Sequence, residues 1–379
     1  MKTLFLVVLG LAALWAPLAW KNVGGQRQLF MCEGVILLCD YWIPRTCAAQ
    51  GYADVDQDVK LEDGQETGWI NGKLKVGARD RPYPAFAVVP MRLFPYTWGG
   101  AWLWTALMAI GYVLVLCLLG KTFWPLVLFV SMPLLYNVER GNPIGFTATF
   151  VAVFLLWWNH PDSTKRKVAA MALAAATAMK LTPCLLGALY LPQLWRTRGR
   201  FAEPFIAGFA ALVLLVVPFG LMPDGFAGIP KMIANAAENG VFYARCGDFG
   251  LLPFWRAVRV LLHQDCTNAW PGCVPFVRLM QVLGLAAVLY GGIRQHMKLL
   301  VYGAMLAAGN MFYYGVLYFV PLLILDLRRL TPFLIVCWAI VLSAFQFCIA
   351  GHSGNGLLVN VAILALVIEE LAVRKAKAC

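Results

Sequence analysis

The sequence predicts an all-α polytopic membrane protein. Of its 379 residues 61% are hydrophobic and 13% are charged, and the mean hydropathy is +0.71. These values lie far from those of soluble domains, and the chain offers roughly a dozen apolar runs of the length that crosses a bilayer. Basic residues stand directly beside these runs. We therefore expect one membrane domain that covers residues 1–379.

The first apolar run, from Leu4 to Trp20, follows Lys2 at the N-terminus. A cleaved secretory signal needs small residues before its cleavage site, and Pro17 stands where one of them should be. The run therefore predicts an uncleaved first transmembrane helix.

Further apolar runs predict about 10–12 transmembrane helices in total. The expected spans after the first are 97–119, 122–138, 143–159, 168–180, 182–194, 204–222, 274–292, 299–309, 311–326, 332–350 and 357–373. Several are too short to cross a bilayer upright. We expect the regions 168–194 and 299–326 to hold either short spans or broken or re-entrant helices, which membranes tolerate where protein or water satisfies the backbone.

The formal net charge of +12 invites a nucleic-acid interpretation, but the positions of the basic residues argue against it. Basic residues that flank apolar runs stay on the cytoplasmic side. The clusters are Lys165–Lys167, Arg196/Arg198/Arg200, Arg294/Lys298, Arg328–Arg329 and Arg374/Lys375/Lys377. With the spans above they all fall on one side, which predicts cytoplasmic termini, membrane lipids as partners and no nucleic acid.

Two long loops are expected on the opposite, outer side, at about 21–96 and 223–273. In the first, Leu29–Leu38 is apolar and predicts an interfacial helix, whereas Ala53–Asp80 is polar and predicts irregular structure. Pro84–Tyr96 is amphipathic, and its three prolines exclude one straight helix. The expected location is a bacterial inner or plasma membrane, with the site on the periplasmic or extracellular side.

Six of the 11 cysteines lie in these outer loops, where an oxidising compartment would permit disulfides. Cys266 and Cys273 are close enough in the chain to close a small loop, but spacing does not fix connectivity. No paired Cys-x-x-Cys or clustered histidine signature is present, so neither a metal site nor a cofactor is expected.

Asp40 follows the apolar stretch Gly34–Cys39, which places a carboxylate at the outer membrane surface. Such a carboxylate can act as a general base and take a proton from an acceptor hydroxyl that attacks a sugar carbon. The alternative is a solvated loop acid or a helix cap.

Four cationic or aromatic side chains are candidate partners of a donor phosphate. Arg81 and Tyr83 lie in the proline-containing segment Arg79–Pro84, and arginine pairs bidentately with phosphate. Arg140 and Lys180 offer further positive charge to a leaving phosphate. The alternatives are a pair between Arg140 and the neighbouring Glu139, and a Lys180 that extends to the membrane interface.

A second group of candidates lies in the later outer loop. Asp248 and Arg256 flank the stretch Phe249–Trp255, and Arg259 shares a helical face with Arg256. These arginines would contact lipid phosphates, or else belong to a merely interfacial helix.

Taken in order, several motifs resemble the polyprenyl-phosphate-mannose-dependent mannosyltransferases of glycosyltransferase family 87, which have the GT-C fold. The motifs are Asp40-Tyr41 followed by Ala48–Tyr52, then Pro82–Phe86 with Pro90, Arg140-Gly141-Asn142, Lys180–Pro183 and Asp248–Leu251. This chain departs from the family in having Ala85 where a second proline is usual and Asn142 where glutamine is usual.

The resemblance implies a GT-C fold with a long first outer loop and surface helices. It also implies that Asp40 is the catalytic base. Asn142, in the Arg140-Gly141-Asn142 motif, is a further candidate for substrate binding beside Tyr83, Arg140, Lys180 and Asp248. The implied reaction is a metal-independent, inverting transfer from a polyprenyl-phosphate sugar donor to a lipid or glycan acceptor at the outer leaflet.

A transporter or lipid flippase is the alternative from another functional class, in which the same charges would line a path across the membrane. Transporters commonly contain two related halves, and the sequence shows no such repeat. A structural membrane scaffold is a third possibility, but it does not readily explain Asp40, Arg81 and Lys180 together.

Overall fold

The computed structural model describes most of the chain after its first 20 residues. The described residues are 21–23, 26–28, 38–52, 57–58, 75–76, 83–196, 201–246, 273–307, 312–342 and 357–378. The first expected span and the expected interfacial helix before Leu38 lie outside them. The structure described below is therefore that of the helical bundle and of parts of the two expected outer loops.

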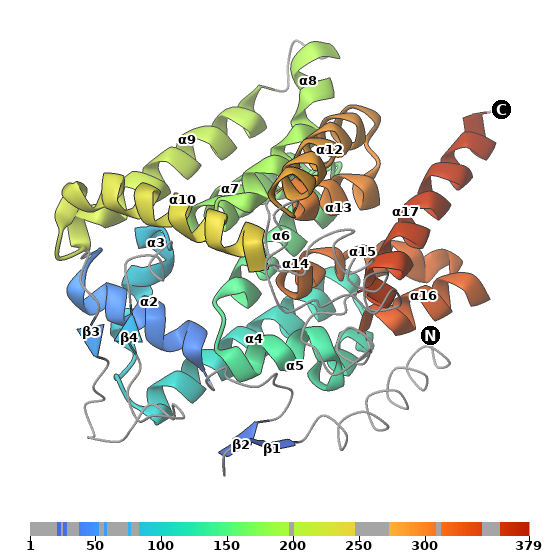
Figure 1. The fold of residues 1–379 in the computed structure, drawn as a ribbon. Helices are drawn as coiled ribbons and strands as arrows, with labels where there is room; N and C mark the ends of the chain where they lie inside the picture. Colours follow the sequence, from blue (N-terminus) through green and yellow to red (C-terminus); the bar gives the residue numbers. More distant parts are fainter. Residues whose placement is uncertain are drawn as a thin grey trace.

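The described residues form a bundle of helices, which confirms the all-α prediction (Figure 1). Two short antiparallel hairpins lie at its edge, β1 (Lys21–Val23) with β2 (Gln26–Gln28) and β3 (Gln57–Asp58) with β4 (Lys75–Val76). The first half of the bundle contains α2 (Cys39–Gln50), α3 (Ala85–Val88), η2 (Val89–Leu93), α4 (Trp98–Gly120), η3 (Trp124–Val130), α5 (Met132–Arg140), α6 (Ile144–Trp157) and α7 (Ser163–Met179). The second half contains η4 (Thr182–Tyr190), α8 (Leu191–Arg196), α9 (Ala202–Val216), η5 (Val217–Leu221), η6 (Gly225–Ala227), α10 (Gly228–Cys246), α12 (Cys273–Arg294), α13 (Met297–Ala307), α14 (Phe312–Phe319), α15 (Leu322–Asp326), η7 (Leu327–Arg329), α16 (Pro332–Leu342) and α17 (Leu357–Ala378).

Prolines set many of the boundaries. The single span expected at 122–138 is wrong, because the chain there divides into η3 and α5, each with a proline in its first turn. Proline lacks an N–H and disfavours helix at the residue before it. Of the two alternatives for 168–194, the structure shows an interrupted segment, since α7 ends at Met179 and η4 begins at Thr182, directly before Pro183. The segment Pro84–Tyr96 is likewise broken, into α3 and η2.

Small residues allow the central helices to approach closely. Ten residues of α7 between Ala169 and Met179 are buried, and most of them are alanine. The helix α7 packs against both α6 and α9. Between α12 and α13, a Cβ added at Gly284 would lie 2.5 Å from the backbone nitrogen of Ala307. Close backbone approach through small residues is typical of helix pairs in membranes.

One end of the bundle, here called the Asp40 end, gathers α2, η2, η5 and the turn between α5 and α6. The Tyr41 hydroxyl donates a hydrogen bond to the carbonyl of Pro95 at 2.9 Å, just before α4 begins. Arg92 donates to the carbonyl of Leu221 in η5 at 2.6 Å. The segments that meet here are those that the sequence assigns to the outer side.

The other end, here called the Lys298 end, gathers the end of α4, the α6–α7 turn, the α12–α13 turn and α15. A Cβ on Gly120, the last residue of α4, would lie 3.4 Å from Cδ1 of Ile324 in α15. Arg166 in α7 and Glu203 in α9 form an ion pair of 2.7 Å, which joins the starts of those helices. The helices α4, α6 and α9 each connect the two ends, so the turns assigned to one side of a membrane gather at one end of the bundle.

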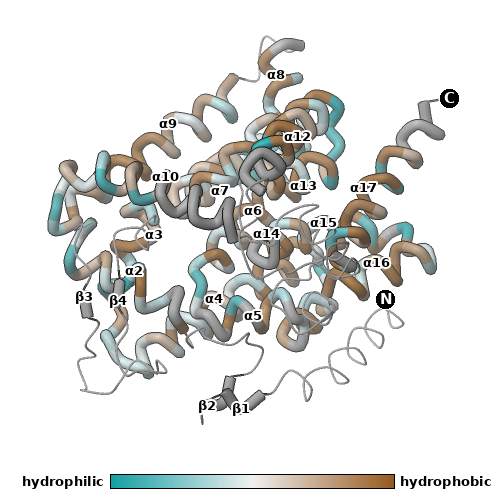
Figure 2. Tube along the Cα trace, in the orientation of Figure 1, coloured by the Kyte–Doolittle hydropathy of each residue, from teal (hydrophilic) through white to brown (hydrophobic). Residues whose placement is uncertain are grey.

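Among the described residues, two helical segments are long and apolar enough to cross a membrane, Trp98–Gly120 and Ala202–Leu221. Four shorter apolar helices accompany them. Brown, hydrophobic positions occur along α9, α12 and α16 in Figure 2. Many of these side chains are exposed, for example Phe205 and Phe209 on α9 and Val282 on α12. Soluble proteins rarely expose apolar patches of this extent.

Candidate functional site

The helix α2 carries Asp40 at the Asp40 end. The sequence places this residue at the start of a loop, whereas the structure places it in the first turn of a 12-residue helix. An acidic residue in the first turn of a helix interacts favourably with the helix dipole, which accounts for this difference. The structure describes the backbone of Asp40 and not its side chain.

Hydrogen bonds and aromatic packing fix α2 in place. Thr46 bonds to the Tyr96 hydroxyl at 2.7 Å, and Arg45 donates to the carbonyl of Phe94 at 3.2 Å. Trp42 is fully buried, and its ring packs edge to face against the rings of Tyr96 and Trp98. The segment that carries Asp40 is thus held rigidly against the start of α4.

The turn Arg140-Gly141-Asn142 joins α5 to α6. Gly141 has φ 65°, a left-handed conformation that terminates α5 and that favours glycine. The buried Asn142 side chain accepts a hydrogen bond from the backbone N–H of Ile144 at 2.9 Å. Asn142, a candidate for substrate binding, therefore has a structural role at the start of α6. Arg140 is the last residue of α5, and its side chain is not described.

The start of α2 and this turn are in contact. A Cβ on Gly141 would lie 2.9 Å from Cβ of Tyr41 and 3.3 Å from Cδ2 of Leu38. These two residues are close neighbours of Asp40 in the chain, and Gly141 directly follows Arg140. The segments of the candidate base and of one candidate phosphate partner are about 100 residues apart in the sequence. The fold brings them together, because Gly141 contacts Tyr41.

Tyr83 and Lys180 also lie at the Asp40 end. The carbonyl of Tyr83 accepts a hydrogen bond from the Tyr52 hydroxyl at 2.6 Å, and Tyr83 directly precedes α3. Lys180 follows α7, with its backbone N–H bonded to the carbonyl of Ala176. The helices α7 and α9 begin together and pack side by side, and α3 contacts α7, α9 and η5. Lys180 is half-buried.

Three candidates cannot be placed. Arg81, Asp248 and Arg256 lie outside the described residues. The described part of the stretch expected as a second outer loop contains the helices η6 and α10.

Asp224, which follows η5, links the end of α2 to the start of the second expected outer loop. Its Oδ2 accepts a hydrogen bond from the backbone N–H of Tyr52 at 2.8 Å and lies 3.6 Å from Nζ of Lys231. Gly51 has φ 79°, and a Cβ there would overlap the Asp224 carboxylate. Burial raises the pKa of the Tyr52 hydroxyl well above its ordinary value.

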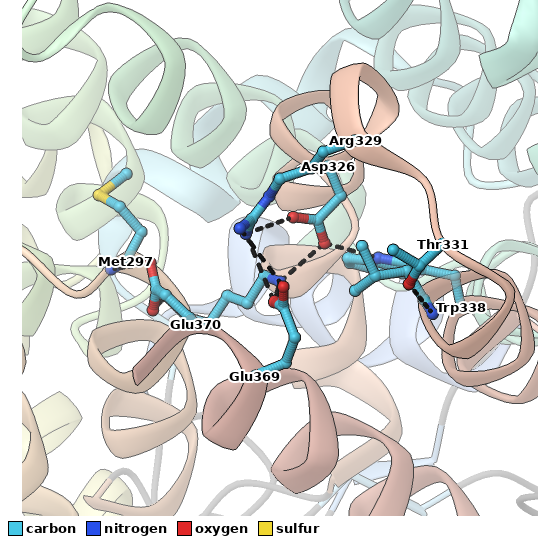
Figure 3. Close-up of polar contacts among 9 residues, drawn as sticks. Met297, Asp326, Arg329, Thr331, Trp338, Glu369 and Glu370 are labelled. Atoms are coloured by element: carbon cyan, nitrogen blue, oxygen red, sulfur yellow. Dashed lines mark hydrogen bonds and ion pairs between the residues drawn. The ribbon is translucent and has the colours of Figure 1, made fainter. Parts of the chain in front are cut away.

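A network of ion pairs, in which Lys298 and Asp326 are buried, lies at the Lys298 end (Figure 3). The Lys298 ammonium lies 2.8 Å from Oδ2 of Asp326 and 3.2 Å from Oε2 of Glu369. Arg329 contacts the same two carboxylates at 3.2 and 3.3 Å. The Trp338 indole N–H donates to Oδ2 of Asp326 at 2.9 Å. Side chains from α13, α15, η7, α16 and α17 therefore meet at one point.

Glu370 completes this arrangement. Its two carboxylate oxygens accept hydrogen bonds from the backbone N–H groups of Met297 and Lys298, at 3.1 and 3.0 Å. The first N–H groups of a helix have no partner within it, so Glu370 satisfies the start of α13. A cavity of about 230 Å³ lies between Lys298, Asp326, Arg329 and Glu370.

Sequence reasoning missed this network. It treated Lys298 and Arg329 as flanking charges and did not single out Asp326, Glu369 or Glu370. The signal was available, because acidic residues within or beside apolar runs are expensive and usually paired. What the sequence does not show is which basic residue each of them meets.

Comparisons of the chain with protein-family models, with curated proteins and with solved structures give no match. What the site can do chemically is therefore inferred from its geometry alone. A carboxylate-bearing segment and a guanidinium-bearing turn meet at one end of an apolar bundle, with Lys180 and Tyr83 at the same end. A base together with cations can serve an attack by a hydroxyl on a phosphate-activated carbon.

Proposed function

We propose that this chain is a polytopic integral membrane glycosyltransferase of the GT-C class. It moves a sugar, mannose by resemblance to family 87, from a polyprenyl-phosphate donor to a lipid or glycan acceptor on the outer face of the membrane. The observation that supports this most is the contact between the start of α2 and the α5–α6 turn, because it joins the Asp40 and Arg140 segments.

The proposed reaction is a single displacement. Asp40 takes the proton of the acceptor hydroxyl while that oxygen attacks the anomeric carbon. The bond between the anomeric carbon and the phosphate oxygen breaks, and polyprenyl phosphate leaves. Attack from the opposite face inverts the anomeric configuration.

Arg140 and Lys180 would stabilise the negative charge that develops on the leaving phosphate, since fixed cations at a developing anion lower the barrier most where water is excluded. Arg81, Tyr83 and Arg256 remain proposed donor contacts, and Asp248 a proposed substrate contact. The exposed apolar surfaces of α9 and α12 would face lipid and leave the prenyl chain free to approach along the bundle.

A transporter or lipid flippase is the second candidate function. The observation in its favour is the network of Lys298, Asp326, Arg329 and Glu369, in which Lys298 and Asp326 are buried, because charged groups within membranes often line transport paths.

The test measures transfer of radiolabelled mannose from polyprenyl-phosphate-mannose into membrane lipids. Asp40→Asn keeps the shape of the side chain but cannot accept the proton, so we expect the initial rate to fall by about a hundredfold or more. Asp58→Asn in β3 is the matched control, because it removes one charge from the same expected outer loop. Equal rates in wild type and Asp40→Asn would refute the assignment of the base, and transport without transfer by the wild type would favour the second candidate.

A further inference from the structure

A cavity of about 420 Å³ opens at the Lys298 end, away from the site proposed above. Part of its wall is apolar and comes from Leu155, Leu156, Met297 and Leu325. The remainder comes from the α6–α7 and α12–α13 turns. The residues of these turns that line it are Trp158, Asn159, His160, Pro161 and Gln295. The cavity thus has an apolar wall beside a polar rim.

The hydrogen bonds of His160 define where its proton lies. The backbone N–H of Asp162 donates to Nδ1 of His160 at 3.0 Å, so Nδ1 carries no proton. A neutral imidazole with an accepting Nδ1 carries its proton on Nε2. Nε2 therefore presents an N–H donor.

The other neighbour of Nε2 is also a donor. Nζ of Lys165 lies 3.4 Å from Nε2 of His160 and 5.3 Å from the centre of the Trp157 ring. An ammonium has three donors and no acceptor, so these two groups cannot satisfy each other. An oxygen that carries negative charge would accept hydrogen bonds from both.

Arg166 and Asp162, the charged neighbours of Lys165 near His160, both have partners, so Lys165 is the cation that we assign to the bound anion. The Arg166 guanidinium is held by Glu203 and by the carbonyls of His160 and Pro161. The Asp162 carboxylate accepts a hydrogen bond from the backbone N–H of Thr164 at 2.8 Å, at the start of α7.

We propose that this cavity binds the phosphate headgroup of an anionic membrane lipid. One phosphate oxygen accepts hydrogen bonds from Nε2 of His160 and from the Lys165 ammonium, and an acyl chain lies along Leu155, Leu156 and Leu325. The apolar wall favours a lipid over free phosphate, which would leave that wall unused. Trp157 and Trp158 fit this placement, since tryptophans gather at membrane interfaces. The proposal rests on the membrane placement of the chain and not on its proposed chemistry.

The test is native mass spectrometry of the full-length protein in detergent, with phosphatidylglycerol as the probe. Diacylglycerol with the same acyl chains lacks the phosphate, and inorganic phosphate lacks the chains. We expect Lys165→Gln to weaken phosphatidylglycerol binding about tenfold, because it removes one charge-assisted hydrogen bond. His160→Phe should have a similar effect, and Lys165→Arg should restore binding.

Lys167→Gln is the matched control, because it removes the same charge from an exposed position on the same helix. Equal weakening by Lys165→Gln and Lys167→Gln would overturn the site, as would equal binding of diacylglycerol. Inorganic phosphate that binds as tightly as phosphatidylglycerol would overturn the lipid as its source. Intact mannose transfer in the Lys165→Gln variant would not affect the proposal, so the two proposals can fail separately.

Discussion

Replacing Lys298 by methionine tests what the ion network at the Lys298 end contributes to stability. Only 4% of the Lys298 side chain and 1% of the Asp326 side chain are exposed, so water screens their 2.8 Å contact little. Removing one partner of a buried ion pair costs about 3–5 kcal/mol, because the other charge stays buried without full compensation. Asp326 retains its contacts with Arg329 and Trp338, which places the expected loss at the lower limit, about 3 kcal/mol.

The assay is equilibrium unfolding in mixed micelles of increasing SDS content, followed by tryptophan fluorescence. Arg329→Gln is the control: 38% of the Arg329 side chain is exposed, so its loss should lower the free energy of unfolding by only about 1 kcal/mol or less. A double variant, Lys298→Met with Asp326→Asn, should recover part of the stability, because it removes the uncompensated charge. A Lys298→Met variant no less stable than Arg329→Gln would refute the reasoning.

Two further predictions concern the Asp40 end. Gly141→Ala should lower the free energy of unfolding by about 2 kcal/mol, because the residue has φ 65° and its new Cβ would lie 2.9 Å from that of Tyr41. The rate of mannose transfer should also fall about tenfold or more, since the Gly141→Ala substitution displaces the Asp40 segment. Above about pH 10 the free energy of unfolding should fall by about 1.4 kcal/mol per pH unit through Tyr52 alone, and Tyr52→Phe should remove this slope.

The sign of the Tyr52 effect follows from its raised pKa. The unfolded chain loses the hydroxyl proton near pH 10, whereas the folded protein keeps it, so stability is full below that pH and declines above it. Parallel pH profiles for wild type and Tyr52→Phe would contradict this. For Gly141, the control is Gly111→Ala in α4, where a Cβ meets no atom within 4 Å. Equal losses of stability in Gly141→Ala and Gly111→Ala would count against the contact between Gly141 and Tyr41.

Helix positions followed from the sequence wherever apolar runs were long. The span expected at 97–119 is α4 at Trp98–Gly120, and that expected at 274–292 lies within α12. Hydropathy did not show where the backbone changes from α to 3-10 geometry. The boundary at Ser131 depends on the prolines of η3 and α5 together with packing against neighbouring helices, and the expectation of one helix there was wrong.

The candidate site was predictable as a set of residues but not as a set of contacts. Composition and order singled out Asp40 and Arg140, and the structure places their segments together. Nothing in the sequence signals that Gly141 meets Tyr41, or that Asn142 caps α6, because both depend on how α2 docks against α4 and α5. The network around Asp326 shows the same limit, since its partners come from four separate helical segments.

Three of the basic residues that suggested the orientation of the chain form ion pairs in the folded protein. Lys298 and Arg329 pair with Asp326 and Glu369, and Arg166 pairs with Glu203. Orientation in a membrane depends on lysine and arginine in short loops and is little affected by acidic residues. The same lysines and arginines can therefore direct insertion first and then, in the folded bundle, hold α13, α15 and α17 together. Ion pairs at the Lys298 end are therefore compatible with the positive-inside pattern that the sequence predicts.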